Sequence, residues 1–117
     1  DDFFKDGMTY DADFTKEFGY APPYQAAESS AALLVFKDAF ERANSFDKVK
    51  VRDALAATKM QTFYGNIKFA EGGQNVDKPM VLFQVMCDGD NCENKVVAPT
   101  KWASAELVHP IPSWSER

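Results

Sequence analysis

Two cysteines lie five residues apart in the last third of the sequence, and the chain has no others. Cys87 and Cys92 flank the run Asp-Gly-Asp-Asn, a composition that favours a tight turn. A hairpin loop of this length brings two Cβ atoms within disulfide distance. In an oxidising compartment we therefore expect a Cys87–Cys92 disulfide, whereas in a reducing one the same residues would be two free thiols.

The polar residues around this turn do not match a metal site. A zinc site needs four ligands, and only His109 could join the two cysteines. A calcium loop needs alternating carboxylates, a central glycine and a distal glutamate at fixed spacing, which this run does not have. Turn formation accounts for its polar side chains, which are Asp88, Asp90, Asn91 and Glu93. We therefore predict no metal and no cofactor.

Catalysis is not predicted either. The only histidine, His109, lies in a proline-bounded tail. A cysteine–histidine pair would require Cys87 and His109 to meet, with a third group that orients the base. The Gly72-Gly73 pair lacks the spacing and the following helix of a phosphate-binding loop. We predict a protein that is not an enzyme, and a small hydrolase that uses Cys87 remains one alternative.

Tyr24 and Gln25 form a candidate site of another kind, because they follow two prolines at the expected start of a long helix. The first N–H groups of a helix have no partner within the helix and favour anionic or polar ligand groups. An aromatic ring and an amide at this place would suit a small polar ligand in a cleft. The alternative is that Tyr24 is a packing residue and Gln25 is merely solvated.

Hydrophobic periodicity indicates the elements that position these residues. We expect three helices, over residues 10–18, 24–44 and 48–58. Thr9 is the expected N-cap of the first helix, and Gly19 ends it. Asp47 is the expected N-cap of the third helix, and Phe46 before it can pack on Val51 as a hydrophobic staple.

The long helix is apolar along two adjoining stripes, which predicts burial on more than one side. Ion pairs between residues four apart indicate its solvent-facing side; they are Lys37 with Glu41 and Asp38 with Arg42. The stripes consist of Ala26, Ser29, Leu33, Phe36, Phe40 and Ala43, and of Ala27, Ala31, Leu34 and Val35.

Beyond Thr58 the periodicity changes from 3.6 to 2, which predicts a strand. Gly65 lies in the middle of it and indicates a bulge or a close backbone approach. We also expect a strand buried on both faces over Met80–Met86 and a return strand over Lys95–Ala98. The two faces of the first strand are Phe63, Ile67 and Phe69, and Tyr64, Asn66 and Lys68.

Length and charge restrict the class of protein. A chain of 117 residues makes one domain at most, and its net charge of −5 is spread along the sequence. The basic residues form no stripe, so no nucleic-acid partner is expected, and no apolar run is long enough to span a membrane. The helices lack strands to cover, so we expect the chain to be part of a larger protein.

An ordered set of motifs resembles the C-terminal third of a type I periplasmic solute-binding protein. The set begins with the Ala-rich helix and "VRDALAAT", continues with "TFYG" and "GQN", and ends with a strand that reaches Gln84, then Pro99 and a closing P-x-P-x-W. The group it resembles is the branched-chain amino acid (Leu/Ile/Val) binding family, the receptor subunits of ABC importers. The resemblance covers the chain from about Tyr10 onward.

The resemblance implies a partial α/β fold of the type I periplasmic-binding-protein kind. Residues 1–79 would supply late helices and a connector strand of the first lobe, and residues 80–117 a crossover strand, the cysteine hairpin and the tail. The implied function is capture of a small amino acid or related carboxylate for an ABC permease, in a periplasmic or extracellular location. A ligand contact of the family matches Gln25, beside Tyr24. Glutamine departs from the apolar aromatic residue of branched-chain receptors, which favours a more polar or aromatic ligand.

A second hypothesis is a free-standing small α+β module whose exposed apolar surface recognises a protein partner. If the chain is a receptor segment, its apolar helix faces and unpaired strand edges would promote self-association of the isolated chain. Folding as a stable monomer without ligand would favour the interaction module.

Overall fold

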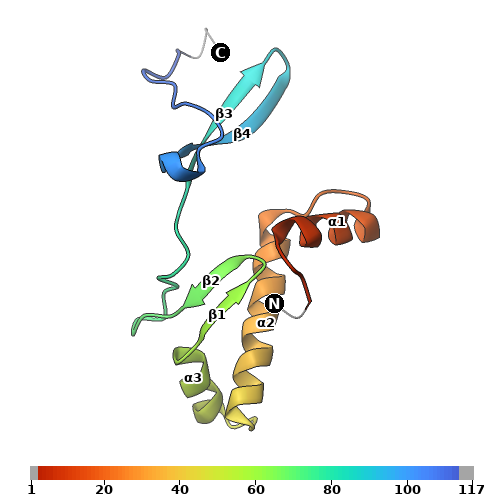
Figure 1. The fold of residues 1–117 in the computed structure, drawn as a ribbon, viewed down its shortest axis with the longest axis vertical. Helices are drawn as coiled ribbons and strands as arrows, with labels where there is room; N and C mark the ends of the chain where they lie inside the picture. The colour runs from red at the N-terminus through yellow and green to blue at the C-terminus, as the bar shows by residue number, and fades with distance from the viewer. Residues whose placement is uncertain (1–2, 114–117) are drawn as a thin grey trace. The chain divides into compact units, whose positions relative to one another are not determined.

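A computed structural model describes residues 3–113 of the chain. It divides into two compact units, Asp1–Lys78 and Pro79–Arg117. The first unit contains three helices and a two-stranded sheet, and the second contains another two-stranded sheet (Figure 1). The assignment of residues 1–79 and 80–117 to parts of two lobes stays a prediction.

Helix α1 spans Gly7–Phe18 and begins earlier than predicted. Its N-cap is Asp6, whose carboxylate accepts hydrogen bonds from the Thr9 backbone N–H (2.8 Å) and hydroxyl (3.0 Å). The prediction of Thr9 as the cap is therefore wrong, because the aspartate three residues earlier reaches the free N–H groups of the first turn. The prediction that Gly19 ends this helix is confirmed: it adopts the left-handed conformation, with φ of 78°.

Helix α2 spans Tyr24–Ala43 and ends at Asn44, which is also left-handed with φ of 43°. Only one stripe of it is buried in the first unit, and Ala31, Val35 and Ala39 form it. On the other predicted stripe Leu33 is 70% exposed, so the prediction of burial on more than one side is wrong for this chain. The described residues place no strand against that side of the helix.

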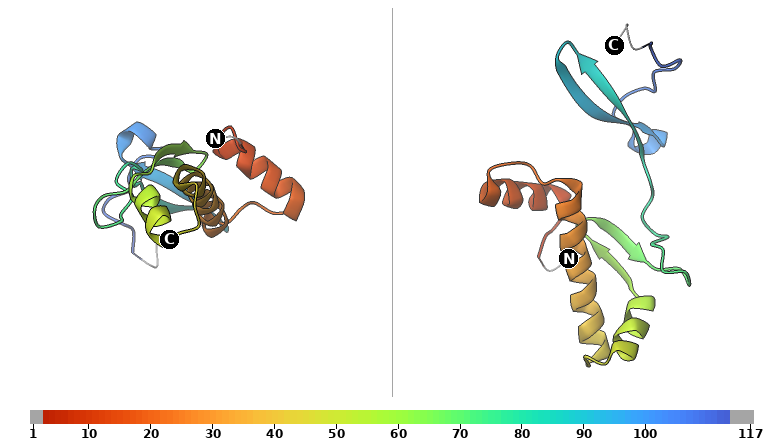
Figure 2. Two further views of the ribbon diagram at one scale, coloured as in Figure 1. Left: turned by 90° about the horizontal axis from the view of Figure 1, so that it is seen from below. Right: turned by 180° about the vertical axis from the view of Figure 1, so that it is seen from behind.

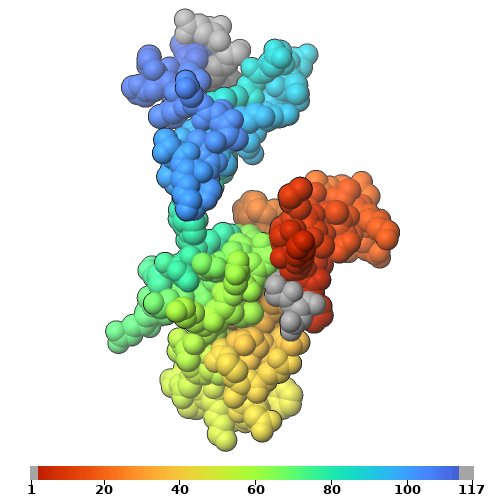
Figure 3. All heavy atoms as spheres, viewed as in Figure 1, coloured from red at the N-terminus to blue at the C-terminus, as the bar shows by residue number. Residues whose placement is uncertain are grey.

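Helix α3 spans Lys48–Ala56, and its predicted cap is confirmed: Asp47 accepts from the N–H groups of Val49 and Lys50. The predicted staple is wrong. Phe46 is 90% exposed and lies against the Phe40 ring, with centroids 5.5 Å apart, instead of packing on Val51. Figure 3 shows the atoms of α3 and of the end of α2 in one continuous body.

Arg42 joins α2 to the end of α3. Its guanidinium donates to the Asp38 carboxylate on its own helix, as predicted for the solvent-facing side. It also donates to the Ala54 carbonyl oxygen (2.8 Å) and to the Thr58 hydroxyl (2.9 Å). Thr58 is buried, so the arginine satisfies a polar group that has little access to water.

The predicted single strand after Thr58 is a β-hairpin. Strand β1, Lys59–Thr62, pairs antiparallel with β2, Gly65–Lys68, and Phe63-Tyr64 forms the turn. The buried Thr62 hydroxyl fixes this turn by accepting from the Tyr64 N–H and donating to the Gly65 carbonyl oxygen. Gly65 has φ of 121°, a backbone conformation that side chains disfavour.

The turn residue Phe63 belongs to an aromatic cluster that holds the N-terminal segment and α1 against the hairpin. Its ring stacks on Tyr10 at a centroid distance of 4.2 Å, and Phe4 contacts both rings edge-on at 5.1 Å. The Tyr10 hydroxyl lies 3.2 Å from the Ser30 hydroxyl of α2. In both views of Figure 2, α1 has one end near the start of α2 and extends sideways from it.

A loop after β2 is closed by one side chain, that of Asn75. Its Oδ1 accepts from the Lys68 and Asp77 N–H groups, and its Nδ2 donates to the Asn66 carbonyl oxygen. Within the loop, the Gly73 N–H donates to the Ala70 carbonyl oxygen at 2.8 Å. The asparagine thus completes a turn that brings the chain back beside β2.

In the second unit, β3 (Leu82–Asp88) pairs antiparallel with β4 (Asn91–Ala98), and a short 3₁₀ helix, η1, spans Thr100–Trp102. The return strand is confirmed and longer than predicted. The prediction of a strand buried on both faces is wrong, because Leu82, Phe83 and Val85 are all exposed. Among the described residues, β3 has only β4 as a strand partner, and η1 contacts β4.

The tail is tied to this hairpin by a side-chain amide. Gln84 donates to the Val108 carbonyl oxygen (3.1 Å) and accepts from the Val108 N–H (3.0 Å). Residues 103–113 form neither helix nor strand, and residues 114–117 lie outside the described part of the chain.

Candidate functional site

The start of α2 carries the predicted ligand residues. Pro23 is the N-cap and supplies no side-chain hydrogen bond, while its carbonyl oxygen accepts from the N–H groups of Ala26 and Ala27. Tyr24 is 68% exposed, and Gln25 is exposed too. Tyr24 is therefore not a core residue in this chain, and both side chains are accessible to a small molecule.

One turn further along α2, Glu28 belongs to a polar cluster that the sequence did not reveal. The Tyr64 hydroxyl donates to Glu28 Oε1 at 2.9 Å. On the face of the Tyr64 ring lies the Lys78 ammonium, 2.9 Å from the ring centroid. The three residues, which we call the tyrosine bridge, come from α2, from the β1–β2 turn and from the last position of the first unit.

The electrostatics of the tyrosine bridge follow from partial burial and from one carboxylate. Burial, followed by the hydrogen bond to Glu28 and the negative charge of Glu28, raises the pKa of Tyr64 to about 12. Burial lowers the pKa of Lys78, and the attraction of Glu28 opposes that effect. At neutral pH the bridge holds a neutral phenol between a carboxylate and an ammonium.

Each residue of the tyrosine bridge has a recognisable sequence context, but nothing in the sequence indicates that the three side chains meet. Glu28 is four positions from Tyr24, which places both on the same side of α2. Tyr64 stands in the "TFYG" motif, and Lys78 precedes a proline. Glu28 and Tyr64 are 36 residues apart in the sequence, and Tyr64 and Lys78 are 14 apart. The β1–β2 hairpin and the loop that Asn75 closes bring them together.

The two cysteines lie in the second unit and form a disulfide. Cys87 and Cys92 are register partners at the end of the β3–β4 hairpin, with Cα atoms 4.0 Å apart. Within residues 3–113, no three histidine, cysteine, aspartate or glutamate side chains gather in a way that could hold a metal ion. A cysteine in a disulfide is not a nucleophile, which removes the basis for a hydrolase that uses Cys87.

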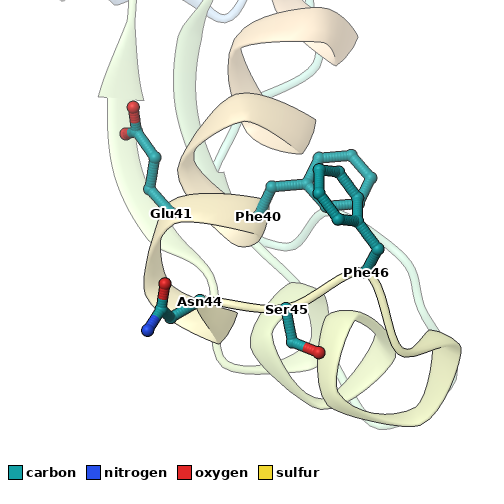
Figure 4. A pocket seen from close by; sticks show the side chains of 5 residues that line it. All are labelled: Phe40, Glu41, Asn44, Ser45 and Phe46. Carbon is teal, nitrogen blue, oxygen red and sulfur yellow. The ribbon is translucent and has the colours of Figure 1, made fainter.

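Two open hollows lie along the exposed side of α2, away from Tyr24 and Gln25. One has a volume of about 320 Å³ and lies where α2 turns toward α3. In Figure 4 the rings of Phe40 and Phe46 lie together at one side of it, while Glu41 and Asn44 point away from them. The other, of about 350 Å³, is lined by Phe3, Phe4, Ser30, Leu33, Leu34 and Lys37. Both are shallow apolar surfaces rather than enclosed sites.

Comparison with known protein families gives a match over residues 3–91 to the periplasmic binding proteins. This range includes the whole first unit, apart from its first two residues, and the β3 strand. The chain belongs to the periplasmic binding protein family. Its mixed helices and small sheets agree with part of the fold of that family.

Members of the periplasmic binding protein family are binding receptors and not enzymes, which agrees with the prediction from the residues. The family assigns to the chain a role in a solute-binding receptor, in partnership with an ABC transporter, without specifying the ligand. Family membership and the disulfide together indicate a location outside the cytoplasm. None of the helices in the part of the chain that the structure describes has the length and apolar character needed to cross a bilayer.

Proposed function

We propose that this chain is part of an extracytoplasmic receptor that captures a small amino acid or related carboxylate and presents it to an ABC permease. Tyr24 and Gln25, at the start of α2, contact the ligand. The receptor works in the periplasm or at the cell exterior. It has no catalytic step, so its function is measured as affinity and as delivery to the permease.

The family match over residues 3–91 is the observation that carries this proposal. The exposure of Tyr24 and Gln25 supports it further, because a ligand-contacting side chain must be accessible before binding. Gln25 offers an amide donor and acceptor where an aliphatic ligand would need an apolar surface. We therefore expect a polar or aromatic amino acid to bind more tightly than leucine.

The first test is the intact mass of the native polypeptide from an extracytoplasmic extract of the source cells. The chain described here has a mass of 13.1 kDa. A native species several times heavier would agree with a segment of a larger receptor, and ligand binding would then be measured on that species. A native species of this same mass would refute the proposal, because a small ligand is usually enclosed over about 70–90% of its surface and the start of one helix cannot do that.

The second test is isothermal titration calorimetry of the native protein with L-leucine, L-glutamine and L-phenylalanine. We expect Gln25→Leu to weaken binding of L-glutamine by about tenfold, because the site loses hydrogen bonds to a polar ligand. Gln61→Leu, an exposed glutamine in β1, is the matched control and should leave the affinity unchanged. Equal affinities in the Gln25 variant and the unmodified protein would exclude Gln25 as a ligand contact.

The alternative, a module that binds proteins, is favoured by the large apolar side chains that the chain exposes. On α2 and just after it these are Leu33, Phe36, Phe40 and Phe46, and on β3 they are Leu82, Phe83 and Val85. An exposed apolar surface of this kind is typical of protein interfaces. Light scattering after gel filtration distinguishes the two cases: self-association of the 117-residue chain is expected for the receptor segment, and a stable monomer for the module.

A further inference from the structure

In the tyrosine bridge, a carboxylate and an ammonium both contact the side chain of Tyr64. The Tyr64 hydroxyl donates a hydrogen bond to Glu28 Oε1 at 2.9 Å, and the Lys78 ammonium lies 2.9 Å from the centroid of the Tyr64 ring. A phenol that donates to a carboxylate gains electron density in its ring, and a richer ring attracts a cation more strongly. Each contact therefore strengthens the other, and Tyr64 is the residue through which they act.

Lys78 is held along its whole length. A Cβ placed at Gly65 would lie 3.6 Å from Lys78 Cγ, so the lysine stem lies over the glycine while its ammonium lies over the neighbouring ring. Lys78 is also the last residue of the first unit, and Pro79 begins the second. The tyrosine bridge thus fixes the point at which the chain leaves the first unit.

The other end of the bridge lies beside the proposed ligand contacts. Glu28 follows Tyr24 by four residues, so the two side chains share one side of α2. A ligand held by Tyr24 would lie on the side of α2 that carries Glu28, the carboxylate to which Tyr64 donates.

We infer that Tyr64 is a positioning residue that couples ligand binding at Tyr24 and Gln25 to the anchoring of Lys78 at the end of the first unit. This inference rests on the proposed function and deepens it, because it names two residues outside the ligand contacts, Tyr64 and Lys78, on which the ligand affinity depends. Coupling of this kind is reciprocal: the ligand tightens the lysine anchor, and the anchor raises ligand affinity by the same factor.

The anchor itself is tested without ligand, by NMR of the Lys78 side chain. Protons above an aromatic ring are shielded, so we expect upfield-shifted Lys78 ε-CH₂ signals in the unmodified protein. Tyr64→Leu should return them to the values of an exposed lysine, whereas Tyr64→Phe should keep most of the shift because the ring remains. Unshifted signals in the unmodified protein would overturn the inference at its first step.

The coupling is tested by calorimetry of the native protein with the amino acid that binds most tightly of L-leucine, L-glutamine and L-phenylalanine. Lys78→Met and Tyr64→Phe should each weaken binding by at least about fivefold, and the double variant should be weaker by less than the product of the two factors. Lys101→Met removes another lysine near an aromatic ring, that of Trp102 at 5.2 Å, and should leave the affinity unchanged.

The outcomes separate this inference from the proposed function. If the unmodified protein binds none of the three amino acids, the proposed function is refuted, and the coupling with it. If it binds one of them and the Lys78 and Tyr64 variants bind equally well, only the inference is refuted. Weaker binding by both variants, together with a ligand-induced change in the shielding of Lys78, supports it.

Discussion

Replacement of Arg42 by alanine should loosen the contact between α2 and α3 more than any other single loss of a surface charge in the first unit. The arginine is 38% exposed, yet its guanidinium donates to two groups on the far side of that contact. These are the Ala54 carbonyl oxygen in the last turn of α3, at 2.8 Å, and the hydroxyl of the buried Thr58, at 2.9 Å.

The magnitude follows from these partners. A hydrogen bond from a charged donor contributes about 1.5–3 kcal/mol when well buried, and partial exposure reduces this to about 1 kcal/mol for each of the two. The exposed pair with Asp38 adds about 0.3–0.5 kcal/mol. We therefore expect Arg42→Ala to lower the free energy of unfolding by about 2–3 kcal/mol, equivalent to roughly 10–20 °C in Tm for a unit of this size.

The assay is urea unfolding followed by circular dichroism at 222 nm, which reports the three helices of the first unit. Two controls separate the contributions. Asp38→Asn keeps both contacts to the α3 side and should cost about 0.5 kcal/mol or less. Arg52→Ala removes a 73% exposed arginine that pairs only with its neighbour Asp53 in the described structure, and should be nearly neutral. Equal losses for Arg42→Ala and Arg52→Ala would refute the reasoning.

Four further predictions concern a glycine, a helix cap, a phenol and the disulfide. Gly65→Ala should destabilise by about 1–3 kcal/mol because φ is 121° there, whereas Gly72→Ala, in open space, should change stability by less than about 0.5 kcal/mol; equal unfolding midpoints in urea would contradict this. The hydrogen bond from the Thr9 N–H lowers the pKa of Asp6, so its contribution to α1 should be present above the ordinary value of 3.8 and be lost as pH falls through the lowered value. An acid titration of helicity that Asp6→Asn leaves unaltered would refute this. In an absorbance titration at 295 nm Tyr64 should ionise near pH 12, and Tyr64→Phe should remove that step. The contribution of Tyr64 to stability is complete below pH 10 and is lost as pH rises through 12. Reduction of the disulfide, which closes a short loop, should lower the free energy of unfolding of the β3–β4 hairpin by about 2 kcal/mol. Unchanged amide exchange in both strands would contradict this.

The sequence is sufficient to predict those features of the fold that depend on interactions between residues close together in the chain. Asp47 caps α3, Gly19 ends α1 and Lys37 pairs with Glu41, as predicted, because each of these contacts joins residues within one turn of helix. The pairing of Cys87 with Cys92 is local too, since a two-residue turn fixes their register. The cap of α1 is ambiguous in the sequence because Asp6 and Thr9 are both good capping residues.

The hairpin of the first unit shows where periodicity fails. Alternation of apolar and polar residues describes one continuous strand and two short strands equally well, and Phe63-Tyr64 has no turn-forming residue type. Tertiary partners decide the turn: Phe63 stacks on Tyr10, while Tyr64 binds Glu28 and carries Lys78 on its face. Contacts over this distance in the sequence have no periodic signature.

The sequence by itself determined the three helices, the C-terminal hairpin and the membership of a family of binding proteins. Only the tertiary structure decided that, among the described residues, no strand packs on the exposed stripe of α2, that the hairpin turns at two aromatic residues, and that Glu28, Tyr64 and Lys78 meet. The physical reason is the range of the interactions. Propensities, caps and ion pairs four residues apart act within a turn or two, whereas burial and a bridged ion pair depend on which distant segments the folded chain brings together.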